Sequence, residues 1–299
     1  MSLVTCKGLS KSYGDKQALK QVDISLNAGN PIALVGPNGA GKTTLFSLLC
    51  GYIKPTSGEI SLLGHPPGSA ALLGRIASLP QDAQLDPNLD VLTQLSFFAS
   101  LQGFDSKAAN AEALRVLNLV DLSDSAKQKP KSLSHGMAKR VSIAQALIGS
   151  PELVLLDEPT AGLDPANAKK IRELVKSLSS KTTFIISSHN LDELEKLCDQ
   201  VLYLEQGQLQ QSVSMSEAQH EDYLTVTMQR CAPASLINAV LGLADISAVE
   251  ERENNQFLIK HNSQQAYAIE IALLQLFKQN NWQYKAILKG RTLEEKLFS

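Results

Sequence analysis

Eight consecutive residues near the N-terminus, GPNGAGKT at 36–43, have the types and spacing needed to bind a nucleoside triphosphate. They fit the phosphate-loop pattern GxxxxGK[ST] and follow an apolar strand expected at 32–35, where such a loop must lie. Glycines at 36, 39 and 41 permit the backbone dihedrals that turn successive amides toward one point, which makes a nest for phosphate oxygens. The helix expected to start near Lys42 adds its positive end.

Two side chains of this loop have chemical roles that follow from the pattern. Lys42 is expected to reach the β- and γ-phosphates of ATP, and the Thr43 hydroxyl is expected to coordinate Mg²⁺. The remaining contacts to ATP fall on Thr44 and on the loop backbone of Gly36, Pro37, Asn38, Gly39, Ala40 and Gly41. A glycine-rich turn with a surface lysine is the alternative, but chance matches in a chain of this length are on the order of one per hundred.

A second group of reactive residues lies in LVLLDEPT at 153–160. Four apolar residues predict a buried parallel strand, and two acids stand at its carboxyl end, where sheets of this kind bind ligands. Asp157 suits an outer ligand of Mg²⁺, and Glu158 suits polarising a water that attacks the γ-phosphate. A strand that meets a solvated turn gives the same pattern, but the phosphate loop in the same chain favours the catalytic interpretation.

A third segment, LSHGM at 133–137, precedes a helical pattern that continues to Leu147. Ser134 resembles a helix N-cap, and the free amides at a helix start can bind an anion. This segment lies some ninety residues after the phosphate loop, so it need not face the same ATP within one molecule. On its residues alone it is only a helix cap.

The elements that must position these residues alternate between strands and helices over residues 1–210, which predicts an α/β sheet. The strands are expected at 32–35, 153–156, 183–187 and 201–204. Apolar residues at helical spacing between Gln81 and Leu133 predict an inserted helical subdomain. The polar stretch 206–221 is the expected linker to a second domain.

Residues 221–299 show a different pattern, in the order β-α-β-β-α-β, which predicts a small α+β domain of the ferredoxin-like kind. Its strands are expected at 224–228, 246–249, 256–260 and 282–288, and its helices at 233–243 and 266–279. This domain could regulate, dimerise or bind a partner.

Taken together, the motifs of residues 1–210 resemble those of the ABC ATPase family. The resemblance implies a P-loop ABC ATPase cassette with a helical subdomain over residues 82–148. Tyr13, in SKSYGDKQAL, matches the aromatic residue that stacks on adenine. Gln81, in SLPQD, matches the glutamine loop, which contacts Mg²⁺ or the attacking water. His189, in IISSHN, matches the switch histidine near the γ-phosphate.

The same resemblance implies a dimer of cassettes that encloses two ATP molecules. In this family each ATP is bound by the phosphate loop of one cassette and the signature segment of the other. Ser134 and Gly136 match the signature, and Asp164, in AGLD, matches the D-loop. The resemblance further implies ATP hydrolysis, a separate integral membrane permease, and a peripheral position on the inner face of the cell membrane.

The signature departs from the commonest family form, LSGGQ, at two positions. His135 replaces the first glycine and Met137 replaces glutamine, whereas Ser134 and Gly136 are retained. Met137, the single cassette and the ending TLEEKLF at 292–298 resemble ATPase subunits of ABC-2-type exporters. The cargo, its direction and the identity of the second cassette stay open.

Composition agrees with a cytoplasmic protein. The chain has 28 basic and 30 acidic residues, a formal net charge of −2, so no global field favours nucleic acid. Its longest apolar runs are far shorter than the about 18 residues of a membrane-spanning helix. Four scattered cysteines without CxxC spacing indicate a reducing compartment. The alternatives are a soluble mechanoenzyme acting on DNA or ribosomes and a non-catalytic nucleotide-binding regulator. The single phosphate loop and the short interval between Gln81 and Leu133 oppose the first alternative, and intact Lys42, Asp157, Glu158 and His189 oppose the second.

Overall fold

The structure is a computed structural model that describes residues 2–188, 191–195, 197–214, 223–230, 232–262 and 266–290. The chain divides into two compact units, Met1–Val213 and Ser214–Ser299. Each unit has its own hydrophobic core. The first unit contains every described residue for which the sequence predicts a role in nucleotide chemistry.

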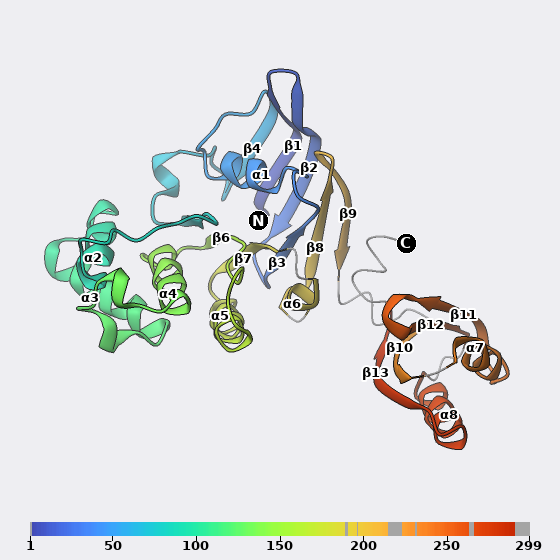
Figure 1. The fold of residues 1–299 in the computed structure, drawn as a ribbon. Helices are drawn as coiled ribbons and strands as arrows, with labels where there is room; N and C mark the ends of the chain where they lie inside the picture. Colours follow the sequence, from blue (N-terminus) through green and yellow to red (C-terminus); the bar gives the residue numbers. More distant parts are fainter. Residues whose placement is uncertain are drawn as a thin grey trace. The chain divides into compact units, whose positions relative to one another are not determined.

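The first unit is built around a six-stranded sheet with the order β5-β6-β7-β3-β8-β9 (Figure 1). Its strands are β3 (Ile32–Val35), β5 (Ile76–Leu79), β6 (Leu153–Asp157), β7 (Thr183–Ser187), β8 (Gln200–Glu205) and β9 (Gln208–Ser214). The pairs from β5 through β8 are parallel. All residues of β3, β6 and β7 are buried, as expected for parallel strands covered on both faces. The strands predicted at 32–35, 153–156, 183–187 and 201–204 are confirmed.

A second, antiparallel sheet in this unit carries the N-terminal residues. It has the order β2-β1-β4, formed by β1 (Ser2–Tyr13), β2 (Lys16–Asn27) and β4 (Ser57–Leu62). Strand β2 alternates between buried and exposed residues, because one face of the sheet covers the core and the other meets solvent. The turn between β1 and β2 leaves Tyr13 at the end of its strand.

Helix α1 (Lys42–Leu49) connects the two sheets through its contacts with β2 and β6. Leu45, Phe46, Leu48 and Leu49 are buried in one cluster with residues of both sheets. Because α1 is apolar around most of its circumference, its position is determined by packing on two sides. The phosphate loop at its start is therefore anchored to the core.

The helical subdomain predicted between Gln81 and Leu133 contains α2 (Val91–Leu101) and α3 (Ser106–Leu119), followed by α4 (His135–Ala146). These three helices lie together and contact one another (Figure 1). Helix α4 also contacts β5. Each begins at a capping side chain: Asp90, Asp105 and Ser134 accept hydrogen bonds from backbone amides of the first turn. The N-cap predicted for Ser134 is thus confirmed.

Two further helices complete the first unit, α5 (Pro165–Leu178) and α6 (Leu191–Glu195). Helix α5 buries Ala168, Ile171 and Val175, which recur at helical spacing, and exposes its charged face. Short 3₁₀ segments occur at Ala70–Leu72, Ser123–Ser125 and Pro130–Ser132.

The predicted linker at 206–221 is wrong over its first half. Residues Gln208–Ser214 form β9, which lies beside β8 at the edge of the six-stranded sheet. The strand escaped prediction because QLQQSVS is mostly polar, and an edge strand needs few apolar residues. The first unit accordingly extends to Val213 and not to residue 210. Residues 215–222 lie outside the described residues.

The second unit has the predicted element order. Its elements are β10 (Tyr223–Arg230), α7 (Pro233–Leu241), β11 (Ile246–Arg252), β12 (Gln256–His261), α8 (Ala266–Gln279) and β13 (Gln283–Lys289), with a 3₁₀ turn at Glu253–Asn255. The strands form an antiparallel sheet in the order β11-β12-β10-β13. Residues of both helices, among them Leu236 and Phe277, pack with β10 and β12 in the core of this unit.

The cysteines and the possible membrane-spanning segments can be checked only within the described residues. Cys6 and Cys198 are buried, as expected for packing residues, whereas Cys50 is partly exposed and Cys231 lies outside the description. The ending at 292–298 also lies outside it. Among the described residues, every helix is too short or too polar to cross a bilayer.

Candidate nucleotide site

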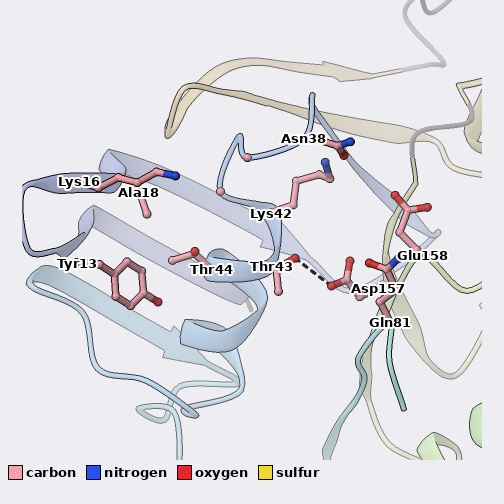
Figure 2. Close-up of a pocket in the computed structure, with 12 residues that line it drawn as sticks. Tyr13, Lys16, Ala18, Asn38, Lys42, Thr43, Thr44, Gln81, Asp157 and Glu158 are labelled. Atoms are coloured by element: carbon pink, nitrogen blue, oxygen red, sulfur yellow. Dashed lines mark hydrogen bonds between the residues drawn. The ribbon is translucent and has the colours of Figure 1, made fainter. Parts of the chain in front are cut away.

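The phosphate loop, the end of β1 and the end of β6 border one cavity of about 270 Å³. Ten residues with predicted roles line it: Tyr13, Asn38, Gly39, Gly41, Lys42, Thr43, Thr44, Gln81, Asp157 and Glu158. Figure 2 shows the Tyr13 ring and the two carboxylates at opposite ends of the site, with the threonines between them. Such a spread suits a ligand with an apolar ring at one end and charged groups at the other.

The glycines of the loop are required by their surroundings. A Cβ at Gly36 would lie 2.0 Å from the carbonyl oxygen of Leu204 in β8. At Gly41, where φ is +110°, a Cβ would lie 2.6 Å from the carbonyl oxygen of Ala18. Both contacts are with backbone atoms, which cannot move aside as a side chain can. The loop therefore passes between β2 and β8 only because these positions lack side chains.

Lys42 is held against its own loop. Its Nζ donates to the carbonyl oxygens of Gly36 at 2.6 Å and Pro37 at 3.2 Å. The residue is only 9% exposed. Since Lys42 begins α1, its ammonium group and the free amides of the first helical turn bring positive charge to the same loop. The arrangement is that of an anion site.

The end of α1 and the end of β6 are joined through Thr43 and Asp157. The Thr43 hydroxyl donates to Oδ2 of Asp157 at 3.2 Å, the dashed line in Figure 2. The other oxygen of Asp157 accepts a short hydrogen bond from the hydroxyl of Ser187. Asp157 is only 5% exposed. These two hydrogen bonds give both carboxylate oxygens the partners that a buried charged group requires.

Ser187 is a residue of the site that the sequence motifs miss. It is the register partner of Asp157 on the neighbouring parallel strand. Besides donating to Asp157, its hydroxyl accepts from the backbone amide of Glu158 at 3.0 Å. One side chain thus contacts both acids, and only the pairing of β7 with β6 reveals this role, because a lone serine at the end of a strand gives no sequence signal.

Glu158 has an unusual backbone conformation. Its φ is +48°, in the left-handed region that non-glycine residues seldom occupy. The hydrogen bond from its amide to Ser187 helps to hold this conformation. The side chain is 8% exposed and borders the cavity. A strained residue at a cavity is typical of functional sites.

The opposite end of the cavity is formed by Tyr13, which is 51% exposed. The ammonium group of Lys11 lies over its ring, 5.1 Å from the centroid, and donates to the carbonyl oxygen of Lys54 at 2.8 Å. Lys16 and Ala18 also line this end and were not predicted. Their position just beyond the turn that follows Tyr13 could have indicated that they line the same end of the cavity.

Gln81 lies beside a cationic side chain from the helical subdomain. Nζ of Lys139, in α4, donates to the carbonyl oxygen of Gln81 at 3.4 Å. Partial burial lowers the pKa of Lys139, while the charges of Asp157, Asp82 and Glu158 act in the opposite direction. The subdomain therefore contacts the rim of the cavity.

The other predicted residues do not line this cavity. Gly36, Pro37 and Ala40 belong to the loop but are not among the residues that line the cavity, and Ser134, Gly136 and Asp164 lie elsewhere on the first unit. Ser134 caps α4 by accepting from the amide of Met137 at 3.2 Å, and Asp164 caps α5. His189 lies outside the described residues.

The donor set fits a nucleotide with a divalent cation. The loop offers an ammonium group and helix-start amides for phosphates, and Tyr13 offers an aromatic face for a base. The oxygens of Thr43, Asp157 and Gln81 border the same cavity, and oxygen ligands are those that Mg²⁺ prefers. A mostly parallel sheet with this loop defines a P-loop nucleotide-binding cassette.

Comparisons with known proteins agree with that class. Residues 19–161 match the family model described as ABC transporter. The Nod factor export ATP-binding protein I of Burkholderia orbicola is 37% identical over 204 residues, covering 67% of each chain. The daunorubicin resistance ATP-binding protein DrrA3 of Streptomyces coeruleorubidus is 32% identical over 255 residues, covering 83% of this chain and 81% of its own.

A solved ATP-binding cassette, described as a dimer in a post-hydrolysis state with ADP and phosphate, shares the fold with a TM-score of 0.64. It is 27% identical, and the match covers 71% of this chain and 98% of that one. The chain belongs to the ABC transporter ATP-binding family. Cassettes of this family bind ATP and ADP.

Proposed function

We propose that this chain is the ATP-hydrolysing subunit of an ABC-2-type exporter, working as a dimer of cassettes on a separate membrane permease. The observation that carries the proposal is the single cavity bordered by the phosphate loop, Tyr13 and the acids at the end of β6. Its charged end suits a triphosphate, and its aromatic end suits adenine.

The residues at the charged end of the cavity, together with Ser187 and His189, then have roles in phosphoryl transfer to water. Lys42 binds the β- and γ-phosphates. Thr43, Gln81 and Asp157 would hold Mg²⁺, which when bound would supply positive charge to neutralise the phosphate oxygens. Glu158 accepts the proton of the attacking water, and His189 contacts the γ-phosphate. The Ser187 hydroxyl keeps Asp157 and the Glu158 backbone in register.

Dimerisation is supported by the residues that do not line the cavity. Ser134, Gly136 and Asp164 match segments that contact ATP across a dimer in this family, and all three lie away from the cavity of their own chain. A second cassette would bring the amides at the start of its α4 to this ATP. The dimer with ADP and phosphate solved for a related cassette agrees with this assembly.

The exporter assignment rests on relatives. The Burkholderia protein is named for Nod factor export and the Streptomyces protein for daunorubicin resistance. The resemblance of the signature, with Met137 at its last position, to that of ABC-2-type exporter subunits supports the same assignment. We further propose that residues 1–213 are the cassette and that residues 221–299, of which the structure describes 223–230, 232–262 and 266–290, form a ferredoxin-like accessory domain. The protein would lie on the cytoplasmic face of the membrane through its permease. The cassette boundary is moved from 210 because the first compact unit includes β9 up to Val213.

The test uses the purified full chain with Mg²⁺ and ATP. Wild type is expected to hydrolyse ATP, Lys42→Ala to lose ATP binding, and Glu158→Gln to lose turnover by about 10²-fold or more while forming a dimer with ATP. Light scattering after gel filtration detects that dimer. Glu173→Gln, on the exposed side of α5, is the matched control and should behave as wild type.

Robust turnover in Glu158→Gln would contradict the role assigned to that carboxylate. Co-purification from membranes, followed by identification of the integral partner, tests the exporter assignment. Recovery of ribosomes or DNA in place of a permease would favour a soluble mechanoenzyme, and wild-type protein that binds ATP without turnover would favour a regulator.

A further inference from the structure

Gly136, the second residue of α4, packs directly against the side chain of Asn167 in α5. A Cβ on Gly136 would lie 2.5 Å from Cγ, 2.6 Å from Nδ2 and 2.8 Å from Oδ1 of Asn167. Cβ atoms in folded proteins do not approach other atoms this closely, so any larger residue at 136 must displace the side chain of Asn167 from its place beside Asp164. Gly136 is buried and Asn167 half-buried.

Asn167 is itself held in place by Asp164. Its Nδ2 donates to Oδ2 of Asp164 at 2.7 Å, and its backbone amide donates to Oδ1 at 3.0 Å. Asp164 also accepts from the amide of Ala166 at 3.0 Å, which makes it the N-cap of α5. The backbone and side-chain amides of Asn167 hold the pKa of Asp164 below its ordinary value.

The two segments meet at a second point. A Cβ on Gly162 would lie 3.5 Å from Nε2 of His135, so the ring of His135 lies next to the 161–164 turn. Residues 133–137 and 161–164 are therefore neighbours through both His135 and Asn167. Asn167 itself belongs to neither segment and matches none of the motifs found in the sequence.

We infer that Asn167 is a positioning residue that couples the signature segment at 133–137 to the D-loop at 161–164, so that both meet the partner cassette as one rigid unit. The inference rests on the proposed function, because both segments act across the dimer. Asn167 fills the space beside Gly136 and is fixed by Asp164. A displacement of either segment thus moves the other.

This coupling has an effect that mere structural support does not have. Asn167 does not line the nucleotide cavity of its own chain, so ATP binding to a single cassette should not depend on it. Closure of the dimer requires both segments to fit the partner together. Loss of Asn167 should therefore weaken ATP-dependent dimerisation and turnover, and leave the ATP affinity of the monomer unchanged.

A double-mutant cycle tests the contact. Asn167→Ala, Gly136→Ala and the double variant are made in the wild-type background for turnover and in the Glu158→Gln background for ATP-dependent dimerisation. Asn167→Ala is expected to weaken dimerisation about fivefold, because it removes one hydrogen bond. Gly136→Ala alone is expected to weaken it about tenfold or more, because its methyl group collides with Asn167.

The double variant shows whether the effect of Gly136→Ala arises from its contact with Asn167. With Asn167 truncated, the methyl group at 136 has space, so the double variant is expected within about twofold of Asn167→Ala. If the two defects multiply, Gly136 is required for another reason and the inference is wrong. A matching change in monomer ATP affinity would also overturn it. Lys169→Ala, on the exposed face of the same helix, is the control and should resemble wild type.

A second measurement separates failure of the proposed function from failure of this inference. Urea unfolding of the same four proteins without nucleotide measures the packing of Asn167 on Gly136 within one chain. Coupling in unfolding, together with no ATP-dependent dimer in Glu158→Gln, would show that the contact exists and that the dimer model is wrong. No coupling in unfolding, with a normal dimer, would contradict the inference alone.

Discussion

The Thr43 hydroxyl donates to Oδ2 of Asp157 at 3.2 Å and thereby joins the start of α1 to the end of β6. These residues are separated by 114 positions in the sequence. Both belong to the oxygen set proposed for Mg²⁺. The hydrogen bond shows that the two elements bring them within reach of one shared ligand.

Replacing Thr43 by Val removes that hydroxyl with little change in shape. The Mg²⁺ concentration that gives half-maximal turnover is expected to rise about tenfold, because one ligand of the cation is lost. ATP binding without Mg²⁺ should be unchanged. Thr44→Val is the matched comparison, because it removes a hydroxyl from the same cavity but no proposed ligand of Mg²⁺. An unaltered Mg²⁺ profile in Thr43→Val would contradict the assignment.

Replacing Ser187 by Ala removes the hydroxyl that bonds to Asp157 and accepts from the Glu158 amide. The free energy of unfolding should fall by about 1–2 kcal/mol, because a buried carboxylate loses a partner. Turnover should fall about tenfold, because both acids are less well oriented. Urea unfolding and steady-state hydrolysis measure the two effects. Ser177→Ala, on an exposed helix face, should change neither, and equal behaviour of the two variants would count against a positioning role for Ser187.

Replacing Tyr13 by Leu removes the aromatic face at the far end of the cavity. ATP affinity should fall about tenfold, in line with the loss of one base-stacking contact. Binding of inorganic tripolyphosphate should be unaffected, since that ligand has no base. Titration calorimetry with both ligands makes the comparison, and Tyr52→Leu is a control at an exposed tyrosine that does not line the cavity. Equal losses for both ligands would show that Tyr13 acts through the loop structure and not through the base.

Lys139 gives a prediction about pH. Burial holds its pKa below the ordinary 10.5, so the folded protein binds this proton less tightly than the unfolded chain. Its contribution to stability is least favourable below the folded pKa and improves as the pH rises toward 10.5. Relative to Lys139→Met, which cannot titrate, wild type should gain stability over that alkaline range.

Urea unfolding of both proteins from neutral pH to the ordinary lysine pKa measures the difference. Lys169→Met, at a lysine on the exposed face of α5, should follow the wild-type curve. Parallel curves for wild type and Lys139→Met would mean that burial does not affect this ammonium group.

The positions of the strands that carry the motifs could be predicted from the sequence. The loop at 36–43 and the acids at 157 and 158 follow apolar strands, and in parallel sheets strand ends meet at one edge. Their meeting in one cavity was therefore predictable. Ser187 was not, because a lone serine after an apolar run has no pattern, and only the pairing of β7 with β6 places it level with Asp157.

The contact between the first turns of α4 and α5 could not be predicted from the sequence either. Nothing in the spacing of Gly136 and Asn167 indicates that they touch, because the contact depends on how α4 and α5 pack in three dimensions. Polar β9 was missed for a related reason, since its pairing partner and not its composition determines its conformation.

Strand β9 also determines where the cassette can be cut. A truncated protein that ends at residue 210 would retain only residues 208–210 of β9 and leave part of β8 without a neighbour on that side. Unpaired amides and carbonyls along a buried, apolar strand promote association between molecules. An isolated cassette should therefore extend through Ser214 if it is to remain monomeric, and shorter versions should aggregate even though every motif is present.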